Sequence, residues 1–158
     1  MRRHTHTAEE TADFGGRLAR SYPGGEDGFA VVYLAGELGA GKTTFAGGFL
    51  RASGVSESVR SPTYTLVELY PVGGRTFVHV DLYRLRTADD VGSLGLRDWA
   101  RAGSVWLIEW PEIAAERLPP PDLVVRFAVG TAGHDIEVEA RSALGRAWLG
   151  QVSAARSS

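Results

Sequence analysis

The sequence predicts an α/β fold in which helices lie on both faces of a mixed β-sheet. Apolar runs of strand length alternate along the chain with segments of helical length, an order of elements typical of α/β domains. Two pairs of strand-like runs are each joined by a few turn residues and predict antiparallel hairpins within that sheet. The 158 residues, of which 44% are hydrophobic, suffice for one compact core. We therefore expect a single domain over residues 1–158, with flexible ends at 1–6 and 153–158.

The first half of the chain predicts a helix, a buried strand, a second helix and a hairpin. Residues 8–21 carry apolar positions near helical spacing and are followed by the glycine-rich loop "YPGGEDG". The run "FAVVYLA", residues 29–35, predicts a buried strand, and Lys42–Ala52 predicts a helix that ends at Gly54. The runs "TYTLVELYP" and "RTFVHVDLY" predict two strands of a hairpin, joined at "VGG".

The second half predicts short helices, one more buried strand and a second hairpin. The segment "ADDVGSLGLRDWARAG" predicts a pair of short helices, and "SVWLIEW" predicts a buried strand. The segment "PEIAAERL" predicts a helix with Pro111 in its first turn. The runs "LVVRFAV" and "HDIEVEAR" predict a hairpin across "GTAG", and the tail from Ser142 predicts a short helix.

A phosphate-binding loop lies between the first predicted strand and the second predicted helix. Gly36 is followed by four residues and then by Gly41, Lys42 and Thr43, which is the spacing of such loops. The glycines let backbone N–H groups face a phosphate, the lysine reaches the outer phosphates, and the threonine hydroxyl can bind Mg²⁺. The expected fold is therefore a three-layer sandwich like that of P-loop NTPases. The alternative is a glycine-rich turn that binds no ligand.

Lysine occurs only once in the chain, at position 42. The other 16 of the 17 basic residues are arginine, so the composition favours arginine at every other basic position. An ammonium group is a compact point charge that fits between the outer phosphates, whereas the planar guanidinium is larger and forked. The retention of Lys42 indicates that the loop requires lysine.

Two carboxylates that could complete a magnesium site stand at the ends of apolar runs. Asp81 ends "FVHVD" and Glu109 ends "VWLIE", although either acid could simply emerge from the core into solvent. Thr63, in "RSPTYT", stands where switch segments sense the outer phosphate, while "SPT" is also an ordinary turn. His79 is expected to be a core histidine, with proton transfer as the alternative.

Composition excludes several classes of protein. The chain has no cysteine, the start "MRRHTHTAEE" lacks the apolar stretch of a signal peptide, and no apolar run approaches the roughly 20 residues that cross a bilayer. We expect a cytoplasmic protein with no membrane partner. The formal net charge of −2 lacks the basic excess of domains that grip a phosphate backbone, so direct binding of DNA or RNA is not expected.

Several segments, taken in order and with their spacing, resemble one family. They are "GELGAGKTT", "SPTYTLVE", "HVDLYRL", "LGL" and "LIEWPE". Together they resemble the TsaE family, the bacterial ATPases of tRNA threonylcarbamoyladenosine synthesis, from about residue 7 to residue 140. The phosphate loop alone is common, whereas "SPTYTLVE" followed by "DLYR" and "LIEWPE" is highly specific. The resemblance implies ATP and Mg²⁺ as ligands.

The resemblance also implies roles for individual residues. The loop residues would bind the nucleotide, namely Glu37, Leu38, Gly39, Ala40, Gly41, Lys42, Thr43 and Thr44. Asp81, Glu109 and Thr43 would hold the metal and the attacking water, and Thr63 would belong to a switch. Trp110 would lie beside the nucleotide and Thr11 near the adenine.

The implied function is ATP hydrolysis that supports a partner pair, TsaB and TsaD. That pair transfers a threonylcarbamoyl group to adenosine 37 of ANN-decoding tRNAs, so the chain would meet tRNA only through the complex. A small-molecule kinase and a nucleotide-gated binding module without useful turnover remain alternatives. A GTPase is set aside because the chain has no asparagine for the guanine-reading Asn-Lys-x-Asp segment. No arginine lies in the loop, so we expect slow hydrolysis by the chain alone.

Overall fold

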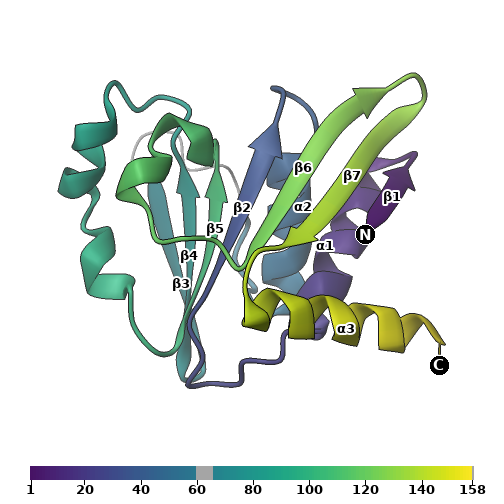
Figure 1. The fold of residues 1–158 in the computed structure, drawn as a ribbon, viewed down its shortest axis with the longest axis horizontal. Helices are drawn as coiled ribbons and strands as arrows, with labels where there is room; N and C mark the ends of the chain where they lie inside the picture. The colour runs from purple at the N-terminus through teal and green to yellow at the C-terminus, as the bar shows by residue number, and fades with distance from the viewer. Residues whose placement is uncertain (60–65, 158) are drawn as a thin grey trace.

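The structure, a computed structural model, describes residues 1–59 and 66–157, within which seven strands form one mixed sheet (Figure 1). The strands are β1 (Arg2–Thr5), β2 (Ala30–Gly36), β3 (Val67–Val72), β4 (Arg75–Asp81), β5 (Ser104–Glu109), β6 (Leu123–Gly130) and β7 (Gly133–Ala140). The helices are α1 (Ala8–Arg20), α2 (Lys42–Ala52) and α3 (Ala143–Ser157), with short 3₁₀ helices η1 (Ala88–Leu94), η2 (Leu96–Trp99), η3 (Pro111–Ile113) and η4 (Ala115–Arg117).

The order of strands across the sheet is β1-β7-β6-β2-β5-β4-β3. The four central strands β6, β2, β5 and β4 are parallel, because helices and loops carry the chain back between them. The hairpins β3–β4 and β6–β7 are antiparallel, which confirms both predicted hairpins. The carboxyl ends of β2, β4 and β5 therefore meet at one edge of the sheet.

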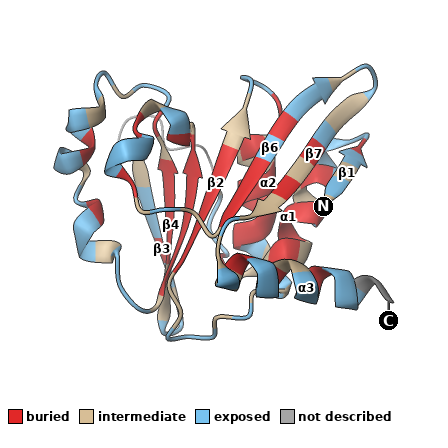
Figure 2. Ribbon diagram, in the orientation of Figure 1, coloured by how far each residue is buried: buried red, intermediate tan, exposed pale blue. Residues whose placement is uncertain are grey.

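Two apolar clusters cover the two faces of the sheet. Helices α1, α2 and α3 pack on one face, and their buried side chains include Phe14, Phe49 and Trp148. The 3₁₀ helices cover β4 and β5 on the other face, where Val91 and Leu118 are buried against the sheet. Figure 1 shows α1 and α2 behind the sheet, and Figure 2 shows the most continuous burial along the central strands. The expected α/β three-layer arrangement is confirmed.

The two end segments for which flexibility is expected, 1–6 and 153–158, contain regular secondary structure. Arg2–Thr5 form β1, which pairs with β7 from Arg2 opposite Glu137 to Thr5 opposite His134. Helix α3 continues to Ser157. The polar run "RRHT" carries no strand signal of its own, and its partner strand is remote in sequence. At the other end, the alanine-rich tail favours helix, so α3 is longer than expected.

The segment "PEIAAERL" forms two 3₁₀ turns instead of the expected single helix. Trp110 adopts a left-handed conformation with φ 59°, and Ala114 separates the turns with φ −144°. The predicted short helices of 88–103 are likewise 3₁₀ helices, η1 and η2, separated by Gly95 at φ 73°. Within the described residues, no helix is both long and apolar enough to cross a bilayer.

Helices α1 and α2 approach closely enough for their backbones to touch. A Cβ atom added to Gly48 would lie 1.9 Å from the Ala12 carbonyl oxygen, and one added to Gly15 would lie 2.2 Å from the Phe45 carbonyl oxygen. Only glycine fits at such distances. This contact places the N-terminal half of α1, including Thr11, beside the start of α2.

Candidate functional site

The loop between β2 and α2 lies at the carboxyl edge of the parallel strands, where ligands bind in open α/β sheets. Gly39 has φ 76° and Gly41 has φ 103°, a left-handed conformation that favours glycine. Gly41 is the N-cap of α2. Because glycine has no side chain, the N–H groups of the first helical turn donate no hydrogen bond to a capping side chain. Such groups provide an anion-binding site at the start of a helix.

Lys42 is held inside the loop. Its side chain is nearly buried, and its Nζ donates hydrogen bonds of 2.7 Å to the carbonyl oxygens of Gly36 and Glu37. The Trp110 ring centroid lies 4.2 Å from the same nitrogen. Desolvation lowers the pKa of Lys42, opposed by nearby carboxylates, of which Glu109 is the strongest contributor.

Glu109 connects the loop to two strands. Its Oε1 accepts a hydrogen bond of 2.8 Å from the Thr43 hydroxyl at the start of α2, and its Oε2 lies 2.7 Å from Nε2 of His79 on β4. Asp81 pairs with Glu109 in the register of β4 and β5, so both acids reach the same edge. Asp81 is less buried and accepts a hydrogen bond of 3.0 Å from the Tyr83 backbone N–H.

A cavity of about 340 Å³ brings most of the predicted site residues together. Those that line it are Thr11, Leu38, Gly39, Gly41, Lys42, Thr43, Thr44, Asp81, Glu109 and Trp110. Ala40 is fully buried beneath the loop, and Glu37 faces a neighbouring hollow, so neither lines this cavity. Thr63 lies outside the described residues.

The environment of Thr11 limits what its hydroxyl can do. The side chain is fully buried, and its Oγ1 lies 2.7 Å from the Thr5 hydroxyl and 3.3 Å from the Thr7 carbonyl oxygen. Its methyl group would contact a Cβ at Gly41 at 3.4 Å. The hydroxyl is thus already satisfied within the protein, and Thr11 shapes the cavity wall.

Three cavity-lining residues were missed by sequence reasoning: Ala8, Tyr83 and His134. Tyr83 directly follows the "DL" of "DLYR", and its ring lies 4.9 Å from that of Trp110, so the segment itself carried a signal. His134 belongs to β7, remote in sequence, and its Nδ1 lies 3.9 Å from the Cβ position of Gly41. Only the sheet topology brings His134 to the loop.

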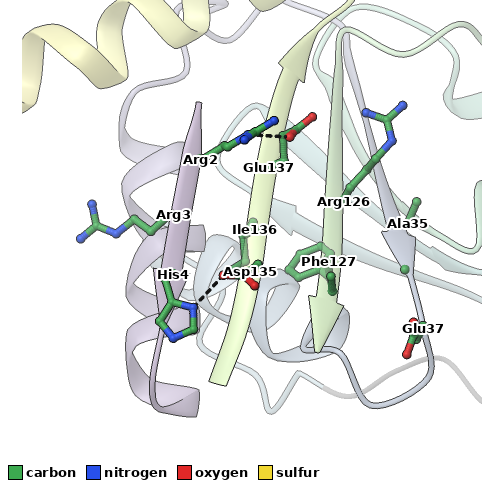
Figure 3. Close-up of a pocket in the computed structure, with 12 residues that line it drawn as sticks. Arg2, Arg3, His4, Ala35, Glu37, Arg126, Phe127, Asp135, Ile136 and Glu137 are labelled. Carbon is green, nitrogen blue, oxygen red and sulfur yellow. Dashed lines mark hydrogen bonds and ion pairs between the residues drawn. The ribbon is translucent and has the colours of Figure 1, made fainter. Parts of the chain in front are cut away.

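A larger hollow, of about 800 Å³, lies on the open face of β1, β7, β6 and β2 (Figure 3). Four of its charged side chains are paired across strands: Arg2 binds Glu137 at 2.9 Å, and His4 binds Asp135 at 2.7 Å. These groups are largely exposed, and each already has its counter-charge. The smaller cavity, with its buried Lys42 and Glu109, is the stronger candidate for chemistry.

A family model described as threonylcarbamoyl adenosine biosynthesis protein TsaE matches residues 5–138. The chain belongs to the TsaE family. This family takes part in tRNA threonylcarbamoyladenosine biosynthesis. The match confirms the resemblance found in the sequence.

Individual members of the TsaE family align over most of the chain. The Haemophilus influenzae protein is 42% identical over 116 residues, which cover 73% of each chain. The Streptomyces coelicolor protein is 36% identical and covers 86% of this chain and 92% of its own. The crystal structure of Bacillus subtilis YdiB superimposes with a TM-score of 0.80 at 27% identity, covering 99% of this chain and 95% of that one.

Proposed function

We propose that this chain is a Mg²⁺-dependent ATPase whose hydrolysis supports a TsaB–TsaD complex forming threonylcarbamoyladenosine at position 37 of ANN-decoding tRNAs. The observation that carries the proposal is the contact between Thr43 and Glu109, 2.8 Å long, which joins the phosphate loop to the end of β5 beside Lys42. Threonine, lysine and a strand-end acid are the set that P-loop enzymes use for Mg²⁺ and phosphates. Membership of the TsaE family supports the tRNA pathway.

The residues of the cavity fit a magnesium nucleotide. Within the described part of the chain, no group of three or more His, Cys, Asp or Glu side chains could hold a metal ion by itself. The cavity is lined by two carboxylates, Asp81 and Glu109, which suits Mg²⁺, because this ion is usually held by one or two carboxylates together with substrate phosphates. When bound, Mg²⁺ neutralises phosphate charge and ATP supplies the phosphoryl group that water accepts.

The residues of the cavity would have different roles in binding the nucleotide and the metal. Lys42 offers a buried ammonium to the outer phosphates, and the backbone N–H groups at the start of α2 face the same place. Thr43 would bind the metal directly, with Glu109 and Asp81 holding its water shell and the attacking water. Trp110 covers the lysine from the side and excludes water from it.

The described residues that line the cavity include no arginine that could contact the transferring phosphoryl group. Arg84, near Asp81, is exposed, and Arg60 lies outside the described residues. A positioned arginine contributes on the order of 1,000- to 100,000-fold in rate in P-loop enzymes. Hydrolysis by the chain alone would therefore be slow, and a docking partner would accelerate it. The chain would reach tRNA only through this partner, with no direct contact to DNA or membrane.

Steady-state phosphate release tests this proposal. The chain is assayed with ATP alone, with TsaB and TsaD added, and with Mg²⁺ removed by a chelator. We expect a low rate alone, a higher rate with the partners, and none without Mg²⁺. A high rate that the partners leave unchanged would contradict the coupling, and transfer of phosphate to a small acceptor would favour a kinase.

A further inference from the structure

His79 makes a buried contact with Glu109, and this contact has no role in the proposed hydrolysis as described so far. The side chains of His79 and Glu109 are 0% and 3% exposed, and the Nε2 to Oε2 distance is 2.7 Å. His79 lies opposite Leu107 in the register of β4 and β5, two residues before the level of Glu109. The imidazole thus contacts Glu109 from within the core, because His79 is fully buried and does not line the cavity, whereas Glu109 does.

The hydrogen-bond partners indicate which ring nitrogen of His79 carries the proton. Nδ1 is buried and has no hydrogen-bond partner among the described residues, whereas Nε2 faces a carboxylate oxygen, which only accepts. In the neutral ring, a proton on Nδ1 instead of Nε2 would leave a buried donor unpaired and two acceptors facing each other across 2.7 Å. The Nε2–H tautomer satisfies the strong contact and leaves only an acceptor unpaired.

The two oxygens of Glu109 therefore have different partners. Oε1 accepts from the Thr43 hydroxyl, which is the group that would turn to the metal. Oε2 is held by His79, which belongs to the sheet, is fully buried and does not line the cavity. When Thr43 changes partner, His79 is the contact that still fixes the carboxylate, whose terminal torsion is otherwise broad.

We infer that His79 is a positioning residue, which donates a hydrogen bond from Nε2 to Glu109 and keeps its carboxylate oriented for hydrolysis. This inference rests on the proposed ATPase function. His79 touches neither nucleotide nor metal, because it is fully buried and does not line the cavity. Partners of this kind typically change activity or metal affinity by about 10- to 100-fold when removed.

Three variants test the inference in turnover. His79→Leu removes the donor, and His79→Gln retains an N–H donor near the position of Nε2. Val78→Ala is the matched control, because this equally buried neighbour on β4 points to the opposite face of the sheet. With TsaB and TsaD present, we expect His79→Leu to lower kcat by about 10- to 100-fold with KM for Mg-ATP and affinity for Mg-ADP within about twofold. His79→Gln should recover most of kcat, and Val78→Ala should retain it.

A measurement on the wild-type chain keeps the inference independent of how the variants fold. Long-range ¹H–¹⁵N correlation spectra of the imidazoles should show His79 as the Nε2–H tautomer, with a slowly exchanging proton, both alone and with Mg-ADP. An Nδ1–H tautomer would overturn the inference, as would an active His79→Leu variant equal to Val78→Ala. A wild-type chain without turnover in the presence of the partners would instead contradict the proposed ATPase function, and the spectra would still decide the His79 contact.

Discussion

Replacing Gly48 by alanine should destabilise the protein, although alanine is the better helix former. In the interior of α2 the exchange gains about 1 kcal/mol of helix propensity. The new Cβ, however, would lie 1.9 Å from the Ala12 carbonyl oxygen and 2.5 Å from its carbon, both backbone atoms that no side-chain rotation can move. Restoring an ordinary contact of 3.4 Å requires α1 and α2 to separate by about 1.5 Å. Overpacking costs typically 1 to 3 kcal/mol, so at the upper end of that range we expect a net loss of about 2 kcal/mol.

Urea unfolding followed by circular dichroism measures this loss. Gly150→Ala is the control, because Gly150 lies in α3 with no atom within 4 Å of its Cβ position, and alanine there should stabilise by up to about 1 kcal/mol. The two variants should thus differ by about 3 kcal/mol in the free energy of unfolding. Equal midpoints and slopes for both would refute the close contact between the helices, and with it the reason why Thr11 lies beside the loop.

Two further predictions concern the site and the edge of the sheet. Glu109→Ala should lower turnover by about 100-fold or more and Asp81→Ala by less, because under the proposed function both acids act through the metal and the attacking water. The affinity for Mg-ADP, measured by calorimetry, should change less than turnover, and wild-type rates in both variants would exclude the two acids from hydrolysis. The hydrogen bond to Asp135 raises the pKa of His4, so its stabilisation is present below about pH 6.5 and is lost as the pH rises through the folded-state value. The melting temperature should accordingly fall more in His4→Ala at about pH 5 than at about pH 9, and an equal fall at both would show that the pair does not act.

Local signals in the sequence were enough to predict the central helix and strands of the fold. The helix Lys42–Ala52 was predicted with its observed bounds, because a glycine loop starts it and Gly54 follows it. The strands β2 and β5 are buried along most or all of their length. Short continuous apolar runs are typical of strands buried on both faces, so both strands could be predicted from sequence. The strand β1 and the 3₁₀ turns after Trp110 were not predicted, because pairing with β7 and a left-handed backbone at tryptophan depend on the rest of the fold.

Some residues of the candidate site could be predicted from local sequence, whereas other contacts in it could not. Lys42, Thr43 and Glu109 could be found from sequence because the loop has fixed spacing and the acid ends an apolar run. The contact of His79 with Glu109 depends on the parallel register of β4 and β5, and the approach of His134 depends on the order of strands. Neither arrangement is local, so neither leaves a signal in the spacing of residues.

The most direct test of the account is Mg²⁺-dependent phosphate release from ATP by the wild-type chain and by Lys42→Ala, each with TsaB and TsaD present. Lys42 is the only lysine of the chain and lies buried in the loop. Under the proposed function it would supply the charge-assisted contact to the outer phosphates. We predict release by the wild type that the partners increase, and release at background level by Lys42→Ala with weaker binding of ATP. A Lys42→Ala chain that keeps the wild-type rate would remove the phosphate loop from the mechanism.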